Sequence, residues 1–225
     1  MSNLSTTYQK VDSQPNTVLR NTYMLLGLSL LPTILGAMIG KGLNFSVLAG
    51  SPLMGTIIML GVMFGMMWAI KANQNSGIGV VLLLVFTGLM GLMLGPMLQV
   101  TLSMSNGAEL VGLAAGGTGA IFLTLAGIAT TTKRDFSFMG KFLMIGLILL
   151  ILAMVANIFF QVPALSLALS AVAILLFSGF LLYDISRIVN GGETNYILAT
   201  LGVYLSIYNI FQNLLNILIS TMGDD

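Results

Sequence analysis

Seven long apolar segments alternate with short polar stretches along the chain. Each segment is close to the roughly 20 residues that an α-helix needs to cross the hydrocarbon core of a bilayer. The pattern therefore predicts an all-α, polytopic membrane protein with seven transmembrane helices. The expected spans are residues 22–40, 51–70, 78–100, 109–130, 141–160, 163–183 and 196–219.

Four prolines refine these boundaries. Pro52 and Pro163 stand where helices are expected to begin, and the first turn of a helix tolerates the missing N–H. Pro32 and Pro96 lie inside the first and third spans, so kinks are predicted there. The link between the fifth and sixth spans, around Gln161, is so short that these two helices must form a tight hairpin.

Small residues recur four apart in several spans, a spacing that lets membrane helices approach closely. We interpret them as helix-packing faces, with a substrate groove as the alternative. The positions are Gly36 and Gly40, Gly61 and Gly65, Gly91 and Gly95, and the run from Gly112 to Ala120.

Residues 1–20 are polar and contain no apolar run of the kind found in a cleaved signal peptide. We expect a short disordered tail, either an inert leader or an exposed segment for a cytoplasmic partner. No repeat or linker divides the remainder, so residues 21–225 are predicted to form a single seven-span domain.

Composition agrees with a membrane protein. Hydrophobic residues make up 57% of the chain and charged residues 7%, against about 25% charged in soluble domains. A net charge of +1 gives no electrostatic basis for binding nucleic acid. The chain has no cysteine and no histidine, which removes zinc sites, disulfides and thiol or histidine catalysis. No metal ion or cofactor is expected.

The basic residues predict the orientation, since loops rich in lysine and arginine stay in the cytoplasm. With a cytoplasmic N-terminus, only Lys41 falls on the opposite side, and seven spans place the C-terminus there as well. The residues on the cytoplasmic side are then Lys10, Arg20, Lys71, Lys133, Arg134, Lys141 and Arg187.

The last span carries a polar face. At about 100° per residue, five polar side chains fall within an arc of about 80°, with Gln212 beside it and Tyr204 and Tyr208 continuing it. Unpaired amides cost free energy in hydrocarbon, so this helix is expected to be central, with the other six around it. The amides either hold helices together or line a polar path. The five in the arc are Ser206, Asn209, Asn213, Asn216 and Ser220.

Asp184 ends the sixth span, and an ionisable residue at membrane depth is a functional candidate by default. The alternative is a structural carboxylate, hydrated at the interface or paired with Arg187 three residues later. A stop at Gly191-Gly192 follows, Thr194 or Asn195 can cap the next helix, and Glu193 lies near its positive end.

The chain lacks the residues that two classes of intramembrane enzyme would need. An aspartyl protease needs two carboxylates that share a proton, and no second acidic residue lies inside a span. A serine–lysine pair would need a lysine at membrane depth, whereas every lysine lies in a loop. We therefore expect no catalytic residues.

Several segments, in order, resemble the Bax inhibitor-1 family of seven-span membrane proteins, most closely its bacterial YccA-like branch. The similarity covers nearly the whole chain. Its segments are Leu19–Tyr23, Leu94–Pro96, Thr131–Phe138, Met154–Phe159 with Pro163–Leu165, Gly191–Ile197 and Tyr204–Phe211.

The resemblance implies two functions. Bacterial proteins of this branch bind and restrain FtsH, a membrane-anchored AAA protease, which engages them through a cytoplasmic N-terminal tail. Residues 1–20 match that tail in position and polarity. Other members of the family are pH-sensitive calcium leaks controlled by two aspartates. Asp184 falls on the first of these, whereas Ser206 stands at the second, so a proton shared by two carboxylates is lost here.

We therefore expect a multi-pass protein of the bacterial inner membrane, with its C-terminus in the periplasm, that modulates an FtsH-type protease. The alternative is a leak for Ca²⁺ or H⁺. In that hypothesis Asp184, Arg187 and Ser206 form the gate. The polar path comprises Tyr204, Asn209, Gln212, Asn213 and Asn216.

Overall fold

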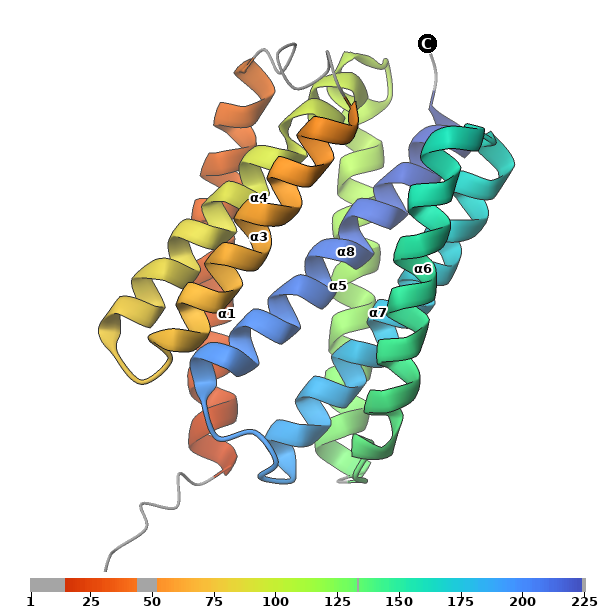
Figure 1. The fold of residues 1–225 in the computed structure, drawn as a ribbon. Helices are drawn as coiled ribbons and strands as arrows, with labels where there is room; N and C mark the ends of the chain where they lie inside the picture. Colours follow the sequence, from red (N-terminus) through yellow and green to blue (C-terminus); the bar gives the residue numbers. More distant parts are fainter. Residues whose placement is uncertain (1–14, 44–51, 133, 224–225) are drawn as a thin grey trace, which may run out of the picture.

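The computed structural model describes residues 15–43, 52–132 and 134–223, and every element in these ranges is helical (Figure 1). The helices pack lengthwise as a bundle. Their bounds are α1 Pro15–Gly42, α3 Pro52–Ala72, α4 Gly77–Ser103, α5 Gly107–Thr132, the 3₁₀ turn η1 Ser137–Met139, α6 Gly140–Phe160, α7 Pro163–Val189 and α8 Tyr196–Met222.

Seven apolar helices follow the order and approximate bounds predicted from the sequence. Six are long and apolar enough to cross a membrane, and α3 contributes a shorter apolar segment, Ile57–Ala72. Pro52 and Pro163 begin α3 and α7, as predicted. Pro32 and Pro96 lie within continuous helices.

Two boundaries differ from the prediction. Helix α7 continues to Val189, so Asp184 lies inside the helix rather than at its end. Charged residues do not stop a helix; the stop comes at Gly191, whose φ of 75° is left-handed. Helix α1 begins at Pro15, so residues 15–20 are helical instead of forming part of a tail, and Val18 packs in a buried cluster with Ile188 and Ala199. The expected disorder of residues 1–14 lies outside the described residues.

Helices α1 and α4 approach each other closely, and glycines make this approach possible. A Cβ on Gly36 would overlap the carbonyl group of Gly88, and one on Gly91 would overlap the carbonyl group of Thr33. Further along, a Cβ on Gly40 would overlap the carbonyl group of Leu92, and one on Gly95 would overlap the backbone of Gly40. The prediction that these two pairs are packing faces is confirmed.

The other small-residue spacings differ from one another in the described part of the chain: Gly117 and the fully buried Ala114, in the run from Gly112 to Ala120, pack against α8. A Cβ on Gly61, Gly65, Gly112 or Gly116 would meet no atom within 4 Å. The packing prediction is therefore wrong for Gly61 and Gly65 and holds for only part of the run from Gly112 to Ala120, because spacing alone cannot show which face of a helix meets a neighbour.

Helix α8 is the most buried of the candidate spans, with 56% of its apolar window covered against 39% or less in the others. It contacts α1, α3, α4, α5 and α7. The sequence predicts six helices around it, but in the described residues α6 contacts α7 and η1 and does not reach α8. The two-residue link after Phe160, with Gln161 at a φ of 50°, folds α6 directly back along α7.

Candidate functional site

The carboxylate of Asp184 on α7 lies against the backbone of α8 at Gly202. A Cβ built on Gly202 would stand 2.8 Å from Asp184 Oδ2 and 3.2 Å from its Cγ. Within the described ranges, no hydrogen bond or ion pair is formed with this carboxylate. An ionisable group held without a direct partner between two helices remains the strongest candidate for a functional residue.

Arg187 does not form an ion pair with Asp184. Such a pair was one structural role predicted for Asp184 as the alternative to a functional one. Its Nη2 lies 3.6 Å from Glu193 Oε2 and donates a 3.1 Å hydrogen bond to the carbonyl of Gly192. Its guanidinium carbon is 5.5 Å from the ring centroid of Tyr183. Arg187 therefore reaches forward to the α7–α8 turn and stabilises it, leaving Asp184 without a direct cationic partner.

Ser206, the third predicted gate residue, is buried on α8 one helical turn beyond Gly202. No hydrogen bond joins it to Asp184 in the ranges that the structure covers. Ser206 therefore lies one turn along α8 from the glycine that Asp184 contacts, and no hydrogen bond between described residues joins the two side chains.

Tyr204 points away from the amides of α8. Its hydroxyl is 2.8 Å from Thr33 Oγ1 of α1 and donates to the carbonyl of Thr87 of α4 at 3.3 Å. Tyr208 donates to the carbonyl of Met90 at 3.1 Å. Both tyrosines join α8 to the crossing of α1 and α4, so the structure separates Tyr204 from the other residues of the predicted path.

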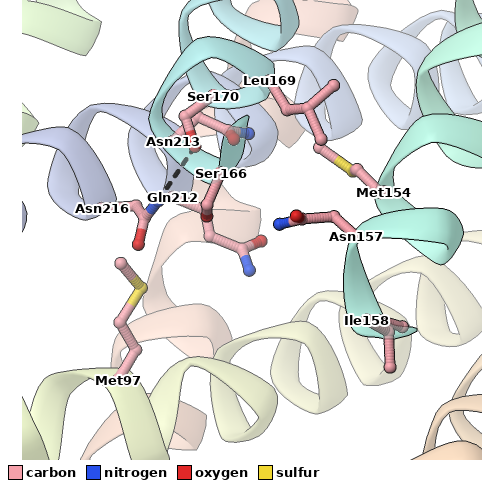
Figure 2. Close-up of a pocket in the computed structure, with 10 residues that line it drawn as sticks. All are labelled: Met97, Met154, Asn157, Ile158, Ser166, Leu169, Ser170, Gln212, Asn213 and Asn216. Carbon is pink, nitrogen blue, oxygen red and sulfur yellow. Dashed lines mark hydrogen bonds between the residues drawn. The ribbon is translucent and has the colours of Figure 1, made fainter. Parts of the chain in front are cut away.

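Three of the predicted path residues do come together. Gln212, Asn213 and Asn216 line a cavity of about 390 Å³ with polar side chains of α6 and α7 (Figure 2). Asn209 does not line it and donates to the carbonyl of Leu205 on its own helix at 2.8 Å. The other lining residues are Met97, Met154, Asn157, Ile158, Ser166, Leu169 and Ser170.

The amides of this cavity are only partly engaged. Asn216 Nδ2 donates to Ser170 Oγ at 2.9 Å, an interhelical bond visible in Figure 2. Asn213 Nδ2 donates to the carbonyl of Asn209, and Asn157 Oδ1 accepts the N–H of Val162 in the α6–α7 turn. Gln212 is exposed and makes no hydrogen bond with another described residue. Some amides therefore join helices, and others present free polar atoms.

The cavity lining contains no charged side chain. Across the residues that the structure describes, no group of three or more His, Cys, Asp or Glu could hold a metal ion. The cavity is suited to uncharged groups that donate and accept hydrogen bonds and that also contact methionine and isoleucine.

A polar cluster that was not predicted from the sequence lies where α7 ends. Ser186 is fully buried; its hydroxyl accepts the N–H of Phe136 at 3.0 Å and donates to the carbonyl of Arg134 at 2.9 Å. Asn190, one turn later, donates to the same Arg134 carbonyl at 3.2 Å. The spacing of Ser186 and Asn190 on one helical face was the available signal.

The loop that this cluster holds has its own order. The side chain and the backbone N–H of Ser137 both hydrogen-bond the carboxylate of Asp135, and these bonds hold the pKa of Asp135 below its ordinary value. The loop therefore enters η1 with an ionised, hydrogen-bonded aspartate.

Asn195, one of the two predicted caps, is the N-cap of α8. Its Oδ1 accepts the N–H groups of Ile197 and Leu198, and its Nδ2 donates to the carbonyl of Gln74 and to Asn75 Oδ1. The cap of α8 therefore also fixes the connection between α3 and α4.

Comparison with known proteins identifies the fold. Residues 15–223 match the family model described as inhibitor of apoptosis-promoting Bax1. The chain belongs to the Bax inhibitor-1 family.

Bacterial relatives of this Bax inhibitor-1 protein are similar over almost their whole length. The Escherichia coli protein named modulator of FtsH protease YccA is 43% identical over 201 residues, which cover 89% of each chain. A Vibrio cholerae membrane protein is 43% identical over 205 residues, 91% of this chain and 90% of the relative. A Neisseria meningitidis protein without an assigned function is 42% identical over 212 residues, 93% of each. The chain is therefore a multi-pass inner-membrane protein similar to a protease modulator.

Proposed function

We propose that this Bax inhibitor-1 protein binds an FtsH-type membrane AAA protease and restrains it. The observation that carries the proposal is the 43% identity, over 89% of both chains, to the relative named modulator of FtsH protease. Such a modulator needs no catalytic residues and acts through its surfaces. In this proposal helix α8, the most buried of the candidate spans, supports those surfaces from within the bundle.

In this proposal the N-terminus is cytoplasmic and the C-terminus periplasmic, an orientation supported by the seven lysines and arginines that it places in the cytoplasm. The polar segment before α1 then lies on the same side as a cytoplasmic protease domain. Residues 1–14 would offer the protease an entry point, and the helical bundle would resist being drawn in.

The test is to delete residues 2–14, which leaves α1 and the buried Val18 in place. The half-life of the chain and the rate at which the protease degrades a membrane substrate are then measured in the same cells. The truncated chain should become longer-lived in cells that contain the protease. An unchanged half-life together with unchanged substrate degradation would contradict the proposal.

A second function is favoured by the position of Asp184. Its carboxylate lies on Gly202, and α8 presents Asn209, Gln212 and Asn216 at spacings of three and four residues along the same, less covered face. In this alternative Ca²⁺ or H⁺ leaks along that face, with Asp184, Arg187 and Ser206 near the gate. Calcium flux into proteoliposomes on both sides of neutral pH, with Asp184→Asn alongside, tests it. Flux equal to that of protein-free vesicles would exclude the leak.

A further inference from the structure

The cavity is lined by residues of four helices, α4, α6, α7 and α8. Helix α6 contacts neither α8 nor α4 in the described residues, and Figure 1 shows no helix in front of α8 between α3 and α6. Met97 of α4 lines one side, and Met154 and Ile158 of α6 line the other. We call this cavity the lateral groove, with Gln212, Asn213 and Asn216 of α8 on its floor.

The floor of the lateral groove and its α6 wall both carry free hydrogen-bonding atoms. Gln212 has no partner in the described part of the chain, and the same holds for Nδ2 of Asn157 and Oδ1 of Asn213. Figure 2 shows the side chains of Asn157 and Gln212 directed toward each other across the cavity. An occupant can therefore both donate and accept hydrogen bonds here.

The side chains that line the lateral groove also limit which chemical groups can bind there. Without lysine or arginine it offers nothing to a lipid phosphate, and without a carboxylate it offers little to a divalent cation. The methionine and isoleucine walls favour apolar contact on both sides of the amides. The matching chemistry is an uncharged polar side chain carried on an otherwise apolar segment.

The position of the lateral groove selects a membrane-spanning segment. Ser166 and Ser170 lie in the first two turns of α7, and Gln212 to Asn216 lie six to ten residues before the end of α8. At 1.5 Å per residue this places the floor about 5 to 15 Å inside the bundle. A helix crossing the bilayer beside α6 would cover both the amides and the apolar walls.

We propose that the lateral groove binds a membrane-spanning helix of the FtsH-type protease, through an Asn, Gln, Ser or Thr side chain that hydrogen-bonds Gln212 and Asn157. The inference rests on the proposed function and adds the site of contact. Polar side chains joining membrane helices supply affinity in the same way within bundles.

The first test is co-purification of the protease with the full-length chain from detergent-solubilised membranes. Gln212→Leu removes the free amide without breaking a hydrogen bond of the described chain, and should lower the amount of bound protease about three- to twentyfold. Gln99→Leu is the matched control, because Gln99 is exposed on α4 outside the cavity, and should leave binding unchanged. Equal binding of the protease by wild type and Gln212→Leu would show that the lateral groove is not the binding site. The proposed function would then still hold.

The second test places a photo-crosslinking amino acid at position 212 or, as a control, at Trp68, which is 73% exposed on α3. Position 212 should form an adduct with a membrane-spanning peptide of the protease, and position 68 should not. Adducts at position 212 with lipid alone, or with a second copy of the chain, would overturn the assignment. If wild-type protein retains no protease at all, the proposed function fails and this inference fails with it.

Discussion

The carboxylate of Asp184 rests on the backbone of Gly202, the residue of α8 that allows α7 to bring a charged group this close. Any Cβ at that position would stand 2.8 Å from Oδ2. Because Gly202 has no side chain, the carboxylate of Asp184 can approach the backbone of α8. The glycines of α1 and α4 allow the close approach of those two helices for the same reason.

Gly202→Ala is expected to lower the free energy of unfolding by about 1–3 kcal/mol, because the new methyl group overlaps the Asp184 carboxylate. Gly61→Ala on α3 is the control, since a Cβ there meets nothing within 4 Å. Unfolding in denaturant, followed by tryptophan fluorescence, measures both. Adding Asp184→Ala should recover most of the loss; a loss independent of residue 184 would show that the contact is not its cause.

Gly36→Ala should cost more, about 3 kcal/mol, since its Cβ overlaps the Gly88 carbonyl, and backbone cannot rotate aside as a side chain can. The folded yield from membranes and the unfolding midpoint should both fall. Gly112→Ala, on an open face of α5, should change neither. Equal effects of the two substitutions would refute the assigned α1–α4 crossing.

Tyr204→Phe should lower the free energy of unfolding by about 1 kcal/mol, because the hydroxyl that joins α8 to Thr33 and Thr87 is lost. Thr33 keeps the carbonyl of Ser29 as a partner, so no orphaned group adds to the cost. Since Tyr204 faces away from the cavity, calcium flux and protease binding should stay at wild-type levels. A large change in calcium flux or in protease binding would show that Tyr204 is part of the functional site.

Ser186→Ala should lower the free energy of unfolding by about 1–3 kcal/mol, because it leaves the partly buried N–H of Phe136 without its acceptor. Hydrogen exchange at the Phe136 amide should become faster, which reports the local bond directly. Ser103→Ala, at an exposed serine that bonds only its own helix, is the matched control. Unchanged exchange at Phe136 would argue against the cluster.

Much of the fold follows from the sequence because bilayer thickness fixes helix length. The apolar runs predict seven helices in the correct order, and Pro163 and Asn195 begin helices where expected. The end of α7 was predicted at residue 183 because Asp184 breaks the apolar run. A polar residue marks the end of an apolar run in the sequence, but it does not end the helix. Helix α7 continues past Asp184 and ends just before Gly191, whose backbone is left-handed.

The candidate site was predictable in part. Gln212, Asn213 and Asn216 share a face of α8 by periodicity alone, and they do share the cavity. The sequence could not show that Asn157 and Ser170 of other helices face them, nor that Tyr204 turns to α1. Those facts depend on the rotation of each helix about its axis. Glycine spacing has the same ambiguity, which is why Gly36 packs closely and Gly61 does not.

The most direct measurement is the rate at which a purified FtsH-type protease degrades a membrane substrate in proteoliposomes, with increasing amounts of this chain reconstituted alongside. If the chain restrains the protease by binding it, the rate should fall and reach a plateau, and Gln212→Leu should need more protein to reach the same plateau. A rate that is the same with and without the chain would contradict the proposed function.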